Sequence, residues 1–157
     1  MTDSTQADAG GNYVSIVREF DAPRALVFKF WTTPALLARW FGPDDYHSPE
    51  EEITIEPQVN GRFYLPMVRL DASERHWMYG MIEELVEPER LTIAVDVPHP
   101  QGLPPLKNTI RVQFHDLGGR TRVELLQGPF PVEEARHETL IGWGQSFQKL
   151  DHALASA

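Results

Sequence analysis

The chain has 157 residues, of which 41% are hydrophobic and 24% charged, so it fits one globular domain and excludes the disordered, collagen-like and coiled-coil classes. It contains no cysteine, which excludes disulfide frameworks, Cys-based zinc sites, iron–sulfur clusters and thiolate catalysis. Its 14 Lys and Arg against 23 Asp and Glu give a net charge of -9. This charge repels phosphate backbones, so we expect no nucleic-acid partner.

The N-terminal segment predicts neither a signal peptide nor a membrane anchor. Residues 1–12 are small and polar, with no basic start and no apolar run. We therefore expect a disordered N-terminal tail, a cytoplasmic protein and no membrane insertion. Residues 13–157 are expected to form a single domain.

The first half of that domain predicts a strand, two short helices and a hairpin. Aromatic and β-branched residues predict a strand over 13–20, and Pro23 and Pro34 each begin a short helix, the second ending near 40–43. Asn60-Gly61 accepts the positive φ angles of a tight hairpin turn, which joins predicted strands 52–57 and 62–70. The acidic run 44–56 is expected to be a solvated edge.

The second half predicts an antiparallel meander and one long helix. Strands are expected at 75–86, 90–97, 108–115 and 120–127, and the loop 98–105, with four prolines, is a stiff, exposed candidate for a pocket rim. Pro131 can occupy the first helical turn, and apolar residues 140, 143, 147, 150 and 154 then form one stripe. The predicted fold class is α+β: a curved antiparallel sheet of about six or seven strands wrapped around the long C-terminal helix, with two short helices after the first strand.

Short stretches distributed over residues 13–154 carry a resemblance to a known family. They are 18–28, Trp31-Thr32-Thr33-Pro34, Trp40-Phe41-Gly42-Pro43, Asn60-Gly61-Arg62-Phe63, Gly80, 88–91, 119–123 and Gly142-Trp143. In this order they resemble the SRPBCC or START-like superfamily, and within it the family similar to the activator of the ninety-kilodalton heat-shock chaperone's ATPase. The resemblance implies a helix-grip fold that encloses a cavity for an apolar or amphipathic small molecule. Asn60 replaces an expected glycine and Phe63 a common tryptophan, which alters the turn and the cavity.

No catalytic motif is present, and the candidate residues instead favour ligand binding. The sequence contains no nucleophile elbow, phosphate-binding loop, dinucleotide fingerprint or His-Glu-x-x-His motif, so we predict no catalytic residue, no metal and no cofactor. The six histidines never fall three or four apart, as a helical metal pair requires. The candidate ligand-binding residues are Trp31, Trp40, Phe63, Leu65, Met67, His76, Met78, Val95, Ile110, His137, Leu140, Trp143 and Phe147.

Two histidines are the candidate polar groups of this cavity. Counting back from Leu140 along the stripe places His137 near the inward face, where it could bond a ligand oxygen or carry a proton. The alternative, which we favour, is a partly exposed histidine in the first helical turn. His76 alternates with Met78 and Gly80 on the predicted cavity face, although a predicted turn lies beside it.

Glycines mark two expected close contacts. Gly142 and Gly144 flank Trp143 within a predicted helix, where each costs about 1 kcal/mol relative to alanine. We therefore expect the sheet or a ligand to approach the helix closely there, with plain packing favoured. Gly80 within a strand predicts a bulge or a close backbone contact.

Three hypotheses about function follow from these features. The first is a non-enzymatic or weakly catalytic carrier, sensor or sequestering protein for a hydrophobic or aromatic small molecule, held in a cavity that stands empty or half-filled without it. The second is a cyclase, aromatase or hydrolase-like enzyme that uses a titratable residue in the same cavity. The third, ranked last, is a chaperone-interaction module, which the family resemblance implies. The sequence leaves homodimer formation undecided.

Overall fold

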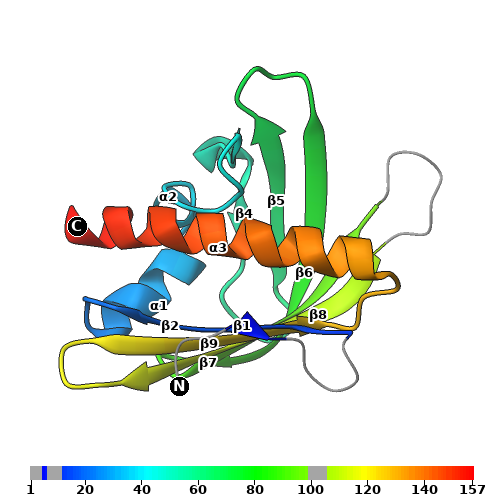
Figure 1. The fold of residues 1–157 in the computed structure, drawn as a ribbon. Coiled ribbons are helices and arrows are strands. Elements are labelled where there is room, and N and C mark those ends of the chain that lie inside the picture. The colour runs from blue at the N-terminus through cyan, green and yellow to red at the C-terminus, as the bar shows by residue number, and fades with distance from the viewer. Residues whose placement is uncertain (1–4, 7–11, 99–105) are drawn as a thin grey trace.

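The computed structural model confirms the predicted fold class, and it describes residues 5–6, 12–98 and 106–157 (Figure 1). The predicted loop 98–105 therefore lies, except for Pro98, outside the described residues. The long strands follow the predicted period-2 segments closely. The elements in chain order are β1 Thr5–Gln6, β2 Val14–Phe20, α1 Arg24–Thr32, α2 Pro34–Leu37, β3 Tyr46–His47, η1 Glu50–Glu52, β4 Thr54–Ile55, β5 Arg62–Arg69, β6 Arg75–Val86, β7 Arg90–Val97, β8 Leu106–Asp116, β9 Thr121–Gly128 and α3 Glu133–Ala155.

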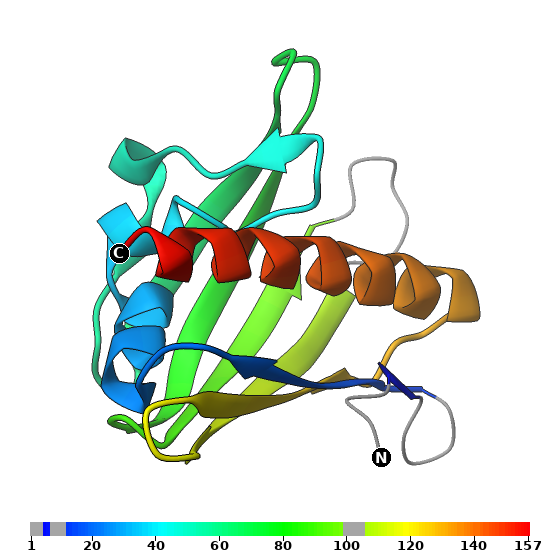
Figure 2. The same cartoon turned by 60° about the vertical axis from the view of Figure 1, so that its left-hand side comes forward.

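All strands belong to one antiparallel sheet in the order β1-β2-β9-β8-β7-β6-β5-β3, and β4 pairs with β5. Figures 1 and 2 show the sheet curling so that α3 runs alongside β2 and crosses β5–β8. The two short helices α1 and α2 close one end, near the C-terminal half of α3. The face of the sheet toward α3 is called the inner face below.

The segment before the hairpin departs from the prediction. The expected strand 52–57 is a 3-10 turn, η1, followed by the two-residue β4, and β3 was not predicted. Charge explains part of this, because the carboxylates of consecutive glutamates are more stable in solvent than in a half-buried strand. Asn60 has the expected positive φ of 69°, whereas Gly61 is needed for space, since a Cβ there would overlap the carbonyl oxygen of Glu56.

Helix α3 begins at Glu133 with Val132 at its N-cap, so Pro131 precedes the helix instead of entering its first turn. Its C-terminal half is fixed to the loop after α2. Lys149 Nζ donates to the carbonyl oxygens of Pro43 and Tyr46 over 3.1 and 3.2 Å. Burial lowers the pKa of this lysine, and the two carbonyls compensate the buried ammonium.

Aromatic residues fill the core beneath this half of the helix. The ring of Trp31 stacks on Trp143 at 5.6 Å and meets Trp40 edge-on at 4.9 Å. Phe147 packs edge-on against Phe20 at 5.5 Å. Because all five rings are buried, this cluster supplies a large part of the apolar burial that stabilises the domain.

Candidate functional site

The inner face is formed by alternate residues of the long strands, as the pleat requires. Leu65 lies opposite Met78 on the β5–β6 pair, and Val97 lies opposite Leu106 on the β7–β8 pair. These opposed residues form one row across the sheet. In the next row, nearer the aromatic core, Val95 of β7 lies opposite Asn108 of β8. In these two rows the inner face is therefore apolar except for the amide of Asn108.

The two halves of α3 cover this face to different degrees. Every buried residue of the helix lies between Trp143 and Leu154, and none lies in Glu133–Gly142. Apolar side chains on the first half of α3 and on the ends of β5, β7 and β8 are consequently only partly buried. We call this region the open end, and it comprises Met67, Val97, Leu106 and Leu140.

A chain of buried polar groups lies next to the open end. Trp143 Nε1 donates to Gln127 Oε1 over 2.8 Å, and Gln127 Nε2 donates to Asn108 Oδ1 over 3.1 Å. Asn108 Nδ2 in turn donates to the Pro129 carbonyl oxygen over 3.4 Å. All three side chains are buried, and each amide nitrogen has used only one of its two hydrogens within the described part of the chain.

A further buried donor belongs to Trp31. Its side chain is fully buried, and its Nε1 finds no acceptor among the described residues. An unpaired buried donor costs about 1–3 kcal/mol. Within the described residues, the interior beneath α3 thus holds donors without a full set of partners, namely one indole N–H and one hydrogen on each of the two amides.

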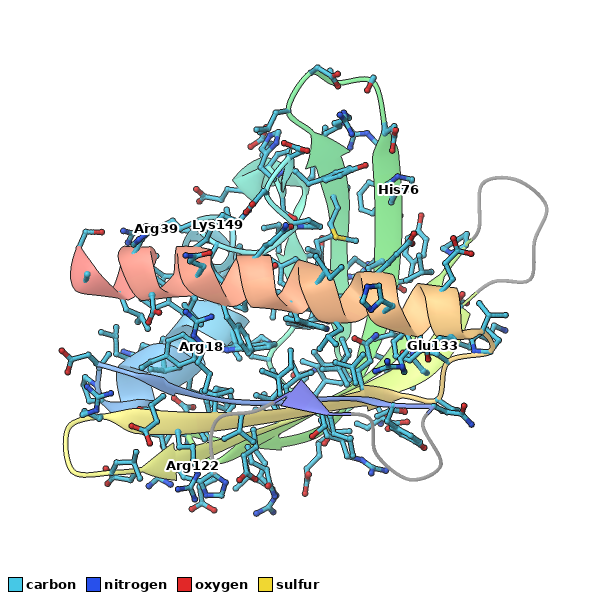
Figure 3. The ribbon with its side chains drawn as sticks, viewed as in Figure 1. Arg18, Arg39, His76, Arg122, Glu133 and Lys149 are labelled. Atoms are coloured by element: carbon cyan, nitrogen blue, oxygen red, sulfur yellow. The ribbon has the colours of Figure 1, made fainter. Side chains whose placement is uncertain are left out.

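Three polar side chains meet at the rim of the open end. Tyr46 Oη donates to Glu74 Oε1 over 2.7 Å, and His76 Nε2 lies 3.1 Å from the same oxygen. The bond to Glu74 raises the pKa of Tyr46, and the bond from Tyr46 lowers the pKa of Glu74. Figure 3 shows His76 on the part of β6 that extends past α3, and its cross-strand partner is Met67.

The structure places the thirteen predicted residues in two groups. The larger group is buried, so this part of the space between sheet and helix is packed rather than empty or half-filled. The smaller group is Met67 and Leu140 in the open end, His76 at its rim, and His137. The buried members are Trp31, Trp40, Phe63, Leu65, Met78, Val95, Ile110, Trp143 and Phe147.

Of the two placements considered for His137, the favoured exposed one is confirmed and the inward one is wrong. This residue is exposed in the second turn of α3, where the helix has no buried residue. The apolar stripe begins only at Leu140, and extending it backwards assumed that the helix touches the sheet along its whole length.

The structure confirms one of the two glycine predictions and contradicts the other. A Cβ at Gly80 would lie 2.7 Å from Ile93 Cγ2 and 2.9 Å from the Phe63 carbonyl oxygen, so the predicted close contact is confirmed. The close approach predicted at the helix glycines is wrong. A Cβ at Gly142 would meet Pro43 at an ordinary 3.6 Å, and nothing lies within 4 Å of a Cβ at Gly144.

Asn108 and Gln127 were missed as site residues. Both occupy inward positions of predicted strands, and the inward residues on either side of them are apolar. A polar residue among apolar inward neighbours is the signal that could have identified them. Their mutual contact could not be found, because it depends on the register between β8 and β9.

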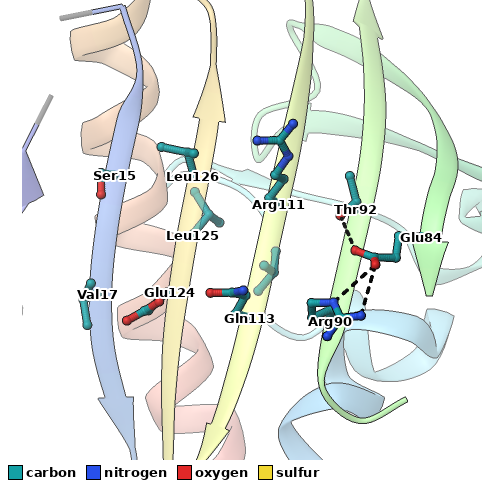
Figure 4. Close-up of a pocket in the computed structure, with 11 residues that line it drawn as sticks. Ser15, Val17, Glu84, Arg90, Thr92, Arg111, Gln113, Glu124, Leu125 and Leu126 are labelled. Atoms are coloured by element: carbon teal, nitrogen blue, oxygen red, sulfur yellow. Dashed lines mark hydrogen bonds and ion pairs between the residues drawn. The ribbon is translucent and has the colours of Figure 1, made fainter. Parts of the chain in front are cut away.

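The outer face of the sheet carries two open depressions. One, of about 420 Å³, crosses the sheet from β6 to β2 (Figure 4). The Glu84 carboxylate within it is bonded by Arg90 over 3.2 Å and by Thr92 over 3.3 Å, so these charges already satisfy one another. The other, of about 550 Å³, lies over β5–β8 beside Tyr64 and Tyr79. Asn108 and Pro129, which end the polar chain, also line the second depression, whereas no member of the chain lines the first.

Metal-ligand clusters and membrane-spanning helices are two further features that the described ranges could contain. Within them, no group of three or more His, Asp or Glu residues could hold a metal ion. None of the described helices combines the length and apolarity needed to span a membrane.

Comparison with known proteins adds a family and a set of related folds. The family model described as Activator of Hsp90 ATPase homolog 1-like protein matches residues 21–155. A solution structure from Arthrobacter aurescens is similar with a TM-score of 0.82 at 24% identity, covering 98% of this chain and 92% of that one. A crystal structure from Chromobacterium violaceum has a TM-score of 0.82 at 21% identity, covering 91% and 96%. The AHSA1 protein of Silicibacter pomeroyi has a TM-score of 0.80 at 20% identity, covering 91% and 97%. No curated protein matches the chain.

Proposed function

Because the chain belongs to the family of Activator of Hsp90 ATPase homolog 1-like proteins, whose helix-grip fold is in general a ligand-binding fold, we propose that it binds a hydrophobic or aromatic small molecule at the open end. The observation that carries this proposal is the change in burial along α3 at Trp143. The apolar side chains before that point are left partly uncovered by the protein itself. A ligand's apolar body would remove them from water, at about 25 cal/mol per Å².

The neighbouring donors define the polar end of such a ligand. Among the described residues, the side-chain amides of Asn108 and Gln127 each use only one of their two hydrogens. A carbonyl, ether or carboxylate oxygen that reached these donors would satisfy groups that are otherwise costly to bury. We therefore favour an amphipathic ligand with an apolar body and an acceptor oxygen.

A non-enzymatic role is favoured over catalysis by the positions of the titratable groups. The enzyme hypothesis requires such a group deep in the site. His76 is one-third exposed at the rim, and His137 is exposed on the surface. The chaperone-interaction hypothesis rests on the family description alone and stays last.

The test is a thermal-shift and fluorescence titration with a set of naphthyl and other aromatic compounds. At 100 times its Kd a ligand adds about 2.7 kcal/mol, which raises the Tm of a domain of this size by about 5–10 °C. Trp143 borders the open end, so tryptophan emission should change in parallel.

Location is tested by a matched pair of variants. Leu140→Asp places a charge in the open end and should weaken binding at least tenfold. Leu117→Asp places the same charge in the turn between β8 and β9, where Leu117 is already 38% exposed, and should leave binding unchanged. Equal affinities in both variants, or no binding by the unmodified protein across the set, would contradict the proposal.

A further inference from the structure

The rim of the open end has a specific hydrogen-bonding character that the apolar residues do not explain. One carboxylate oxygen of Glu74 receives Tyr46 Oη at 2.7 Å and His76 Nε2 at 3.1 Å. The rings of Tyr46 and His76 are 6.0 Å apart. Arg69 also lies beside this group, with its guanidinium 5.9 Å from the centre of the Tyr46 ring and 3.5 Å from the Asp71 carboxylate.

This arrangement fixes which nitrogen of His76 carries the proton. An ionised carboxylate only accepts hydrogen bonds, so the ring nitrogen facing Glu74 must be the donor. In the neutral imidazole the proton is therefore on Nε2, and Nδ1 is left as an acceptor. Within the described residues Nδ1 has no hydrogen-bond donor.

The imidazole also lies beside the open end. His76 is directly opposite Met67 on the β5–β6 pair, and the next inward residue along β6 is the buried Met78. Directly opposed residues of an antiparallel pair have Cβ atoms about 4.5–5.5 Å apart. A ring-sized molecule against Met67 would thus come within reach of His76.

We propose that His76 accepts a hydrogen bond from a hydroxyl group of the bound molecule, so that the preferred ligands are hydroxylated aromatics of the phenol type. Glu74 acts as a positioning residue that holds the imidazole in the accepting tautomer. Tyr46 holds Glu74 in turn. This inference rests on the proposed function, because it concerns a ligand in the open end.

The test compares 2-naphthol with 2-methoxynaphthalene in the full chain. The two compounds share a ring system and an acceptor oxygen, and only the first can donate. One neutral hydrogen bond corresponds to a preference of about three- to tenfold. The unmodified protein should therefore bind 2-naphthol three- to tenfold more tightly, and His76→Leu should reduce this ratio to about one while 2-methoxynaphthalene binding is retained.

Two further measurements separate recognition from a change in folding. His115→Leu alters a histidine on the outer face and should keep the ratio. The imidazole nitrogen NMR signals of His76 should show that 2-naphthol shifts Nδ1 strongly and 2-methoxynaphthalene does not, and Glu74→Gln should weaken this response. If both compounds bind equally, or His76→Leu keeps the ratio, the inference is wrong and the proposed function stands. If neither compound binds, both fail.

Discussion

Replacing Gln127 by leucine tests whether the buried polar chain holds the interior together. Leucine has nearly the same volume but provides neither the acceptor for Trp143 Nε1 nor the donor for Asn108 Oδ1. Two buried groups lose a partner, at about 1–3 kcal/mol each. Part of the loss is offset by the greater apolarity of leucine, so we expect about 3 kcal/mol of destabilisation in total.

Urea unfolding followed by tryptophan emission measures this change, and a thermal scan should show a Tm lower by about 6–12 °C. Gln113→Leu is the matched control, because Gln113 is exposed on the outer face and its replacement should change stability by no more than about 0.5 kcal/mol. Unchanged stability in Gln127→Leu would refute the reasoning. It would mean that water reaches these groups or that leucine packing compensates for both bonds.

Three smaller changes test local features of the fold. Gly144→Ala should stabilise the protein by about 1 kcal/mol in urea unfolding, because nothing lies near the added methyl group, and no gain would show that the glycine is needed. Gly80→Ala should destabilise it by about 1–3 kcal/mol in the same assay, since the methyl group would collide with Ile93, and full stability would contradict the close contact. Arg62 lowers the pKa of Glu56 from its usual 4.5 to about 2 through a side-chain and a backbone bond. Because this pKa is lower in the folded state, the pair stabilises fully above about pH 4.5, and its contribution is lost as the pH falls toward 2. Glu56→Gln should therefore flatten the acid limb of a stability–pH curve, and an unchanged limb would exclude the pair as a contributor.

The sequence predicted those elements whose pattern is enforced by burial on one side. Strand β6 and strand β7 were predicted with their observed bounds, because a half-buried strand must alternate and charged turns end it. The acidic segment before the hairpin has no such pattern. Its pairing with β5 depends on residues far along the chain, which a local reading does not include.

The sequence predicted which kinds of residue line the site, but it predicted only some of their positions. The apolar inner face follows from period-2 alternation, and most of the predicted lining residues do lie on it. Sequence could not show that α3 stops covering the sheet before Trp143, since this depends on the angle between helix and sheet. For the same reason the apolar stripe did not show where His137 lies. The Asn108–Gln127 contact was overlooked for a different reason, because it depends on the register between β8 and β9.

The two halves of α3 differ in what they do: the C-terminal half stabilises the fold, and the first half controls access to the open end. The C-terminal half contributes buried residues to the aromatic cluster and is clamped by Lys149, so it cannot move without exposing the core. The first half has a weaker attachment, in which Arg136 donates to the Tyr13 carbonyl oxygen over 3.5 Å. Displacing it would uncover the partly buried open end without exposing any of the buried residues of the helix. For the ligand proposed above we therefore expect entry to require movement of the first half alone, while the second half maintains the folded state.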